Sequence, residues 1–223
     1  MNNKVSYPEL FFLFFTGSIL GFFLEGIWRV IRTGEWENHS ATVYGPFCII
    51  YGFGAAALYW ITRDVNGMPL WQQFLRFAIA GAVVEYTGSF LQEHLLGSVS
   101  WDYTGRFLSL NGRICFSMTL MWGMLGILYS HLFAPAADHF FDIAVHWPYK
   151  GICAILSIAM AADLLLSAAA LYRWRERQDD IPPQNTIEER LDEHYDDERM
   201  KEIYNNMVFQ DHKKQPAVIL KAK

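Results

Sequence analysis

Acidic side chains interrupt the long apolar stretches of this sequence. Glu25 lies in the stretch from 9 to 31, and Glu85 lies in the stretch from 73 to 96. A carboxylate in hydrocarbon costs about 3 kcal/mol or more unless it meets a partner, a proton or water. We therefore expect both side chains to face the interior of a helical bundle. Two roles stay open for them: contacts that hold helices together, and a site for a substrate or a proton.

Small residues accompany both carboxylates at helical spacing, and they let backbones approach closely. The two faces are formed by Gly17, Gly21, Glu25 and Trp28, and by Gly81, Glu85, Gly88 and Gln92. We therefore expect both acids at helix junctions. Asp163, near the middle of a later apolar stretch, obeys the same rule, and a proton or pairing with Arg113 or Arg76 would neutralise it.

The segment WDYTGRFLSLNGR at 101–113 is the densest mixture of polar and aromatic residues outside the apolar stretches. One interpretation is an interfacial loop with aromatic rings at headgroup depth and Asp102 paired with Arg106. The other is a binding loop in which Arg106 and Arg113 face an anionic group such as a phosphate. The candidate site residues are Glu25, Glu85, Glu93, Trp101, Asp102, Arg106, Asn111 and Arg113.

Signatures of the commoner enzymes are absent, since the sequence has no G-x-S-x-G, H-E-x-x-H or C-x-x-C pattern. A membrane enzyme acting on a lipid or lipid-linked substrate, with a carboxylate as general base, stays as the alternative to transport. His139 with Asp138 and Asp142 could coordinate a metal. A solvated loop explains these three residues better, so we expect no metal and no cofactor.

The composition is that of a membrane protein. Hydrophobic residues make up 52% of the 223 residues and aromatic residues 16%, and the net charge of −5 excludes a nucleic-acid partner. About 20 apolar residues cross a bilayer. The sequence thus predicts an all-α, polytopic helical bundle with about five spans in a transmembrane domain over 1–177. These spans are expected at 9–31, 45–62, 73–96, 112–133 and 149–172.

Basic residues in short loops predict the orientation. One side carries Arg29, Arg32, Arg106, Arg113, Arg173, Arg175 and Arg177, and the other carries Lys4, Arg63, Arg76 and Lys150. By the positive-inside rule the richer side is cytosolic. With five spans the N-terminus lies outside and the C-terminus in the cytosol, in a cell (inner) membrane.

A shift of 67 residues suggests an internal repeat. It places Gly21, Phe23, Leu24, Gly45 and Cys48 over Gly88, Phe90, Leu91, Gly112 and Cys115. Spans one and two would then correspond to spans three and four as a parallel two-helix repeat, with both long loops in the cytosol. Chance matches in an apolar composition are the other explanation. Parallel repeats are common in transporters and place the site at the repeat interface.

The segment 178–223 is an acidic cytosolic tail, with 11 acidic residues against 7 basic ones after residue 177. Thr186 and Glu189 have capping-box spacing, which predicts a helix from about 187 to 207. Its imperfect apolar stripe fits either a solvated helix or a docking helix for a cytosolic partner.

Two segments resemble motifs of a known family. YGPFCIIYGFG at 44–54 and WDYTGRFLSLNGRICF at 101–116, followed by Trp-Gly at 122–123, are similar to those of the ABC-transporter permeases of the CmpB type. The similarity covers about residues 9–135. Ile49 stands where proline is expected, and Leu108-Ser109 where Phe-Asn is usual. The resemblance implies a small multispanning inner-membrane protein with a transport role.

Together, the residues and the resemblance predict a permease-like or transport-associated subunit with a polar intramembrane site near the cytosolic face. The sequence has no P-loop, so ATP-driven work needs a separate ATP-binding subunit and a homo-oligomer is expected. Membrane lipid is a further partner. A lipid enzyme, or a scaffold or assembly factor, is the alternative.

Overall fold

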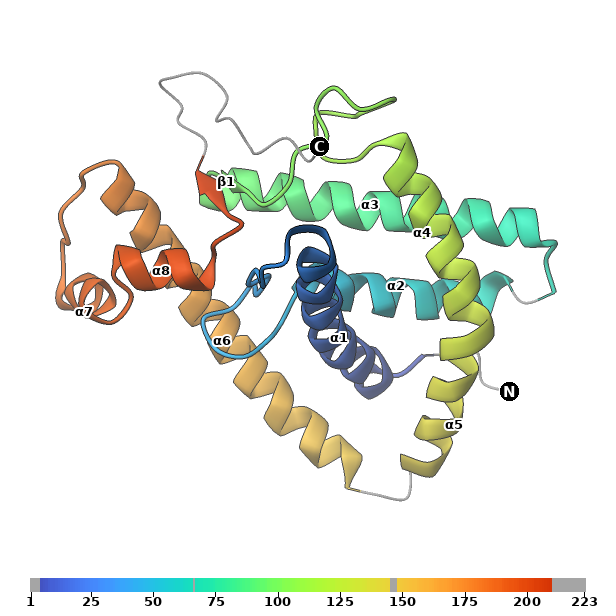
Figure 1. Ribbon diagram of the computed structural model, residues 1–223. Coiled ribbons are helices and arrows are strands. Elements are labelled where there is room, and N and C mark those ends of the chain that lie inside the picture. Colours follow the sequence, from blue (N-terminus) through green and yellow to red (C-terminus); the bar gives the residue numbers. More distant parts are fainter. Residues whose placement is uncertain (1–4, 66, 145–147, 210–223) are drawn as a thin grey trace.

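The computed structural model describes residues 5–65, 67–144 and 148–209, and over these it is an all-α protein. Long helices cross one another around a central α1, and short helices lie beside the end of α6 (Figure 1). The elements are α1 (Tyr7–Thr33), α2 (Ile49–Val65), α3 (Leu70–Leu96), β1 (Ser98–Val99), α4 (Phe116–Leu128), the π-helix η1 (Tyr129–Phe133), α5 (Ala134–Ala144), α6 (Tyr149–Gln178), α7 (Thr186–His194), α8 (Asp197–Ile203) and β2 (Val208–Phe209).

Four segments of the described chain are long and apolar enough to cross a membrane: Tyr7–Thr33, Leu70–Leu96, Phe116–Ala144 and Tyr149–Gln178. The chain is therefore a multi-pass membrane protein. The expected span over 45–62 corresponds to α2, which has 17 residues and falls short of that length. A fifth crossing, and with it the orientation argument from an odd number of spans, stays a prediction.

The ends of the helices follow local signals. Glu9 accepts a hydrogen bond from the backbone N–H of Ser6 at 2.6 Å, so the predicted capping box opens α1. Helix α2 begins at Ile49 rather than at Gly45, because Gly45 is left-handed with φ +80° and the Cys48 N–H donates to the Ser18 carbonyl of α1. That contact fixes where the second helix starts against the first.

The π-helix η1 lies between α4 and α5 and ends at Phe133, directly before Ala134. Pro135 follows directly and has no N–H with which to continue the α-helical ladder. A π-helical turn widens the helix locally and accommodates such an interruption. The fourth predicted span therefore continues beyond residue 133, as one apolar segment through Ala144.

Two helical hairpins, α1 with α2 and α3 with α4, form the centre of the molecule. Glycines allow their close approach. A Cβ on Gly17 would lie 2.7 Å from the Cβ of Ala55 and 3.2 Å from the Tyr51 carbonyl oxygen, and one on Gly126 would overlap Phe77. The small-residue stripes thus lie at helix junctions, as predicted. That the two hairpins are copies of one repeat stays a prediction.

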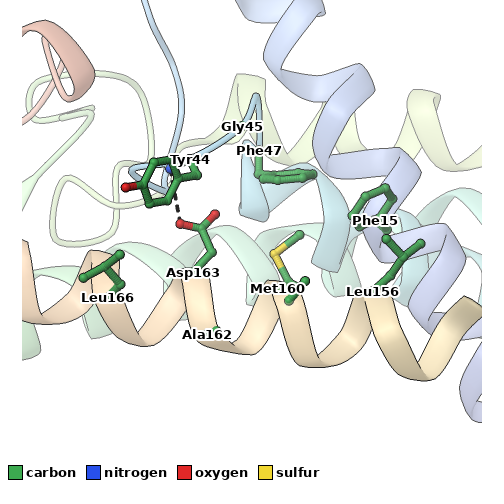
Figure 2. A pocket seen from close by; sticks show the side chains of 10 residues that line it. Phe15, Tyr44, Gly45, Phe47, Leu156, Met160, Ala162, Asp163 and Leu166 are labelled. Carbon is green, nitrogen blue, oxygen red and sulfur yellow. Dashed lines mark hydrogen bonds between the residues drawn. The ribbon is translucent and has the colours of Figure 1, made fainter.

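Helix α6 carries Asp163 beside the segment that joins α1 to α2. The carboxylate oxygen Oδ1 accepts the Tyr44 N–H at 3.2 Å (Figure 2). The same oxygen accepts the Ser167 hydroxyl at 3.4 Å. The expected partner Arg113 pairs elsewhere, with Glu93. Asp163 is therefore held by neutral donors, and no described Lys or Arg forms an ion pair with it.

The segment after α6 folds back onto that helix. Its apolar side chains surround Trp174, and this core consists of Ala170, Leu171, Trp174, Tyr195, Met200 and Tyr204. Strand β2 pairs with β1 in antiparallel register, Ser98 opposite Phe209. The Tyr195 hydroxyl donates to Tyr44 at 3.0 Å. The tail thus joins the end of α6 to the loops that follow α1 and α3.

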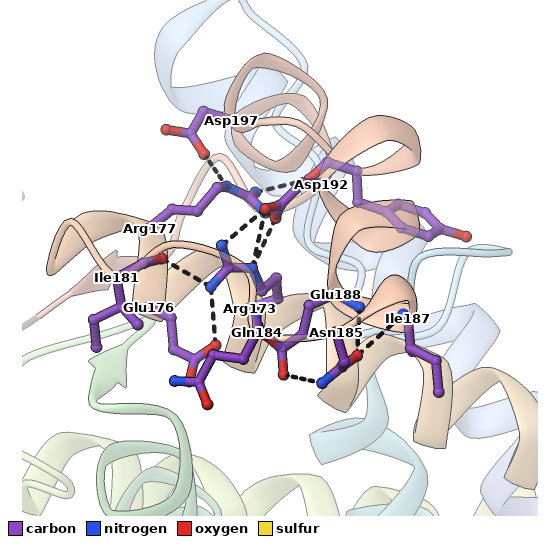
Figure 3. A network of polar contacts seen from close by, with 11 residues as sticks. Arg173, Glu176, Arg177, Ile181, Gln184, Asn185, Ile187, Glu188, Asp192 and Asp197 are labelled. Carbon is purple, nitrogen blue, oxygen red and sulfur yellow. Dashed lines mark hydrogen bonds and ion pairs between the residues drawn. The ribbon is translucent and has the colours of Figure 1, made fainter.

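A network of arginine and aspartate fixes the tail (Figure 3). The Arg173 side chain is 2% exposed; its Nε and Nη2 donate to Asp192 at 2.8–3.1 Å, and its Nη1 donates to Glu176 and to the Ile181 carbonyl. Arg177 bridges Asp192 and Asp197. Such bidentate arginine contacts are the strong, directional kind.

The predicted single helix over 187–207 is two helices, α7 and α8. Tyr195 leaves the helical conformation with φ −129°, and Asp196 starts the second helix by accepting the Arg199 N–H. Asn185 rather than Thr186 caps α7. Much of the predicted apolar stripe is buried within the chain, whereas Ile187 is 72% exposed.

Replacing Gly17 with leucine should separate α1 from α2. The added side chain meets backbone as well as a side chain, so we expect a loss of about 1–3 kcal/mol in unfolding free energy. Thermal unfolding of the detergent-solubilised protein, followed by helical circular dichroism, measures it. The control is Gly151→Leu, where an added Cβ meets nothing within 4 Å. Equal melting of the two variants would contradict the close crossing.

The tail should open in acid through Asp192. Burial alone would raise the pKa of Asp192, but the hydrogen bonds and charges of Arg173 and Arg177 outweigh burial and hold the pKa below its usual range. A depressed folded-state pKa means that these contacts stabilise the tail above about pH 4 and that this stabilisation is lost as the pH falls further, toward the folded-state pKa.

Hydrogen exchange of the amides over 186–204, corrected for intrinsic rates, measures this opening at pH 6 and pH 3. Wild type should lose protection between the two. In Asp192→Asn the free energy of opening of the tail should already be lower than in wild type by about 3 kcal/mol at pH 6, because the buried Arg173 loses an anionic partner. Its amides should therefore be poorly protected at that pH. The matched control is Glu193→Gln, at an exposed position. Wild-type protection in the Asp192 variant at pH 6 would refute the role of this contact.

Candidate functional site

A buried carboxylate joins three parts of the chain near the loop between α3 and α4. Glu85 of α3 is 7% exposed. Its Oε1 accepts the hydroxyl of Tyr103, from the loop, at 2.8 Å, and its Oε2 accepts the indole N–H of Trp122, from α4, at 2.6 Å. Both carboxylate oxygens thus have neutral donors, as a polar group at a helix junction requires.

The second carboxylate, Glu25 of α1, has a similar environment. It accepts the Tyr51 hydroxyl from α2. The two carboxylates also belong to one electrostatic environment, since the charges of both act on the Tyr103 hydroxyl. Among the described residues, neither Glu25 nor Glu85 is paired with a lysine or arginine. We call Glu25, Tyr51, Glu85, Tyr103 and Trp122 the inner cluster.

Tyr103 lies in the α3–α4 loop, outside the apolar spans, and the pKa of its phenol depends on the inner cluster. Burial raises its pKa above the ordinary value, and the charge and hydrogen bond of Glu85 raise it further. Cys115 and Glu25 add smaller effects in the same direction. Tyr103 is therefore a hydrogen-bond donor to Glu85 whose hydroxyl resists ionisation.

The loop between α3 and α4 is folded on itself, which positions Tyr103. The Tyr103 N–H donates to the Gly112 carbonyl at 2.7 Å, and Leu110 bridges Ile114. The Trp101 indole donates to the Arg113 carbonyl at 3.1 Å. Gly112 has φ +71°, and a Cβ there would overlap Asp102, so glycine is required at this turn.

Arg113 and Glu93 form an ion pair beside the inner cluster. The Arg113 guanidinium also lies 5.4 Å from the ring centre of Tyr86 and 5.5 Å from that of Phe90, which adds cation–π attraction. The Asn111 amide donates to the Tyr86 hydroxyl at 2.9 Å. The structure thus brings Glu93, Asn111 and Arg113 together and balances the Arg113 charge within the protein.

Asp102 and Arg106 lie at the exposed surface of the loop. Asp102 accepts the Thr104 N–H at 2.8 Å, and the Arg106 guanidinium lies 5.5 Å from the ring centre of Tyr103. These contacts replace the expected ion pair between the two residues. Arg106 is the exposed cation nearest to Tyr103, whereas Arg113 is mostly covered.

Sequence reasoning did not select Tyr51, Tyr86 or Trp122, because aromatic residues in apolar stretches are typical of the lipid interface. Tyr51 and Trp122 nevertheless lie in the segments that carry the family resemblance. That position was the signal that could have identified them. Tyr86, next to Glu85 on α3, had no such signal.

One acidic residue of α5, Asp138, pairs with side chains of α2. Asp138 accepts hydrogen bonds from Tyr59 and Arg63 of α2, which ties the two helices together. Over residues 5–65, 67–144 and 148–209, no group of three potential metal ligands occurs. His139 and Asp142 are not part of this ion pair, and His146 falls outside the described residues.

The Tyr103 phenol should stay protonated at pH 11, where an ordinary tyrosine is about nine-tenths ionised. In Glu85→Gln its pKa should fall part of the way back, because the neighbouring charge is removed while burial stays. Nuclear magnetic resonance of ¹³C-tyrosine-labelled protein, assigned with Tyr103→Phe, measures the ionised fraction. Glu35→Gln, at an exposed site, should leave the titration unchanged; an unchanged titration in Glu85→Gln would contradict the contact.

Comparisons with known proteins give one assignment. No curated protein and no solved structure matches the chain. A family model described as "Putative ABC-transporter type IV" matches residues 12–168, from α1 to the middle of α6, and so includes the inner cluster and both resembling motifs. Because this match covers well over half of the 223 residues, the chain belongs to the ABC-transporter type IV family of the CmpB type.

Proposed function

We propose that this protein is the membrane-embedded subunit of a transport complex and that the inner cluster binds the transported species. The observation that carries the proposal is that two carboxylates from separate hairpins, Glu25 and Glu85, are each held by neutral donors and both act electrostatically on the Tyr103 hydroxyl. Intramembrane acids of this kind mark substrate or ion pathways.

The chemistry of the inner cluster favours a cation or a protonated amine. Two carboxylates without a described basic partner leave negative charge that a bound cation would neutralise. The hydroxyls of Tyr51 and Tyr103 each keep lone pairs that can accept a hydrogen bond while they donate to the carboxylates. The Glu93–Arg113 pair balances its own charges and so leaves those of the inner cluster uncompensated.

The orientation supports a cytosolic entrance to the inner cluster. The α1–α2 loop, the α3–α4 loop and the tail lie at one end of the bundle, since Tyr44 contacts Tyr195 and β1 pairs with β2. The predicted cytosolic arginines lie in or next to these segments. Arg106 and Arg113 belong to the α3–α4 loop, and the others lie at the C-terminal ends of α1 and α6. By the positive-inside rule, this end and the C-terminal tail face the cytosol.

Membership in the family supports a separate ATP-binding subunit as partner. Such a subunit would dock at the cytosolic end of the bundle. The exposed side chains of Arg106 and Ile187 lie on the surface of that end. A second copy of the chain would complete a substrate path, because transport needs more helices than this bundle provides. A cytosolic partner for the tail would contact its outer face, since most of the apolar stripe is buried.

A thermal-shift screen of the purified full-length protein tests the inner cluster. The panel holds inorganic cations, alkyl amines, polyamines, neutral sugars and organic anions. We expect cations or amines to raise the melting temperature, and their affinity to fall at least about tenfold, or about 1.4 kcal/mol, in Glu25→Gln and Glu85→Gln. Glu35→Gln is the matched control because that carboxylate is exposed.

Stabilisation by anions alone, or stabilisation by cations to the same extent in wild type and in both glutamine variants, would refute a cation site at the inner cluster. Affinity purification from membranes of cells expressing the tagged full chain then separates the classes of function. Recovery of an ATP-binding subunit supports transport. Turnover of a lipid by the purified protein alone would favour the enzyme, and neither a partner nor a ligand would favour a scaffold.

A further inference from the structure

A groove of about 460 Å³ runs between α1, the α1–α2 segment and α6, separate from the inner cluster. Its volume is within the range of about 300–1,000 Å³ usual for ligand sites. The walls are nearly all apolar, from Phe15, Phe47, Leu156, Met160 and Leu166. Asp163 is the only ionisable carboxylate among the residues that line it.

The groove is polar near one end and apolar at the other. Asp163 and Tyr44 lie together toward one end, with Leu166 beyond them, and Phe15 and Leu156 lie at the other end, with Phe47 and Met160 between (Figure 2). From Leu156 to Asp163 the distance along α6 is about 10 Å, at 1.5 Å per residue. The shape therefore suits an amphiphile, with a polar group at Asp163 and a hydrocarbon chain along α6.

Asp163 retains acceptor capacity at this end. Both of its hydrogen bonds within the described chain reach Oδ1, from the Tyr44 N–H and the Ser167 hydroxyl. Its second oxygen, Oδ2, has no donor among the described residues. A carboxylate in an apolar wall calls for a compensating positive charge, and an ammonium group supplies both that charge and N–H donors.

Asp163 lies between a part of α6 that exposes apolar side chains and the part that the tail covers on one face. From Ser167 onward the tail covers one face of α6, on which Ala170, Leu171 and Trp174 are buried, whereas Tyr172 is 54% exposed. Before that point α6 exposes large apolar side chains, of which Ile158 and Leu165 are 72% and 73% exposed. Asp163 thus lies about half a turn from the exposed Leu165 and about one turn before the face that the tail covers.

We propose that this groove binds a phospholipid whose headgroup carries a primary ammonium, with the ammonium on Asp163 and one acyl chain along Phe47, Met160 and Leu156. A quaternary ammonium has no N–H to donate, and an anionic headgroup would be repelled by the carboxylate. The site is independent of the inner cluster and does not rest on the transport proposal.

Native mass spectrometry of the delipidated full-length protein tests this. The probes are phosphatidylethanolamine, phosphatidylcholine and phosphatidylglycerol with identical acyl chains, added at equal concentration. We expect one phosphatidylethanolamine bound at least tenfold more tightly than either other lipid. Asp163→Asn should abolish the preference, and Asp142→Asn, an exposed carboxylate on α5, should keep it.

Ala159→Trp supplies a second variant that does not alter the charge. Ala159 lines the groove from an exposed position, so the indole should fill it and remove binding of all three lipids while helical content and melting temperature stay near wild type. Equal binding of the three lipids to wild type would overturn the proposal, as would an unchanged preference in Asp163→Asn. If the wild-type protein is a dimer that dissociates in Ala159→Trp but not on addition of lipid, a second copy of the chain occupies the groove. That result would also overturn the proposal.

Discussion

Hydrocarbon supplies no hydrogen-bond donors, so a carboxylate in an apolar helix has to find its donors in the protein. Glu25 finds Tyr51 on the neighbouring helix, and Glu85 finds Tyr103 and Trp122. Each donor comes from a different element from that of its acid. The same requirement that makes these acids costly therefore fixes which helices and loops lie together.

Close packing of glycines makes those contacts possible. Glu25 lies two turns after Gly17, which brings α1 against α2, and Glu85 lies one turn after Gly81, which leaves room for the Trp122 ring of α4. A larger side chain at Gly81 would occupy the space of the indole that donates to Glu85. The small-residue stripes and the acids thus depend on each other. The small residues set the distance between the helices, and only at that distance can the carboxylates reach their hydrogen-bond donors.

The sequence predicted well what depends on hydrophobicity and local caps. It predicted a multi-pass helical membrane protein of this family, the capping box at Ser6, and inward-facing Glu85. It could not predict contacts that depend on loop conformation. The partner of Glu85 in the α3–α4 loop follows from a fold held by Gly112, and the break at Tyr195 follows from burial against Trp174, about 20 residues earlier. Neither interaction leaves a periodic pattern in the chain.

The tail that folds onto α6 also limits how the bundle can move. It is fastened at three points: to α6 through Arg173 and Asp192, to the α1–α2 segment through Tyr195, and to the end of α3 through two residue pairs of β1 and β2. The first is a buried, multiply bonded anchor, whereas the last is a ladder of minimal length. The tail therefore links both hairpins to α6, and a motion of the α1–α2 hairpin relative to α3–α4 has to break or shift the contact at Tyr195 or the β1–β2 pair.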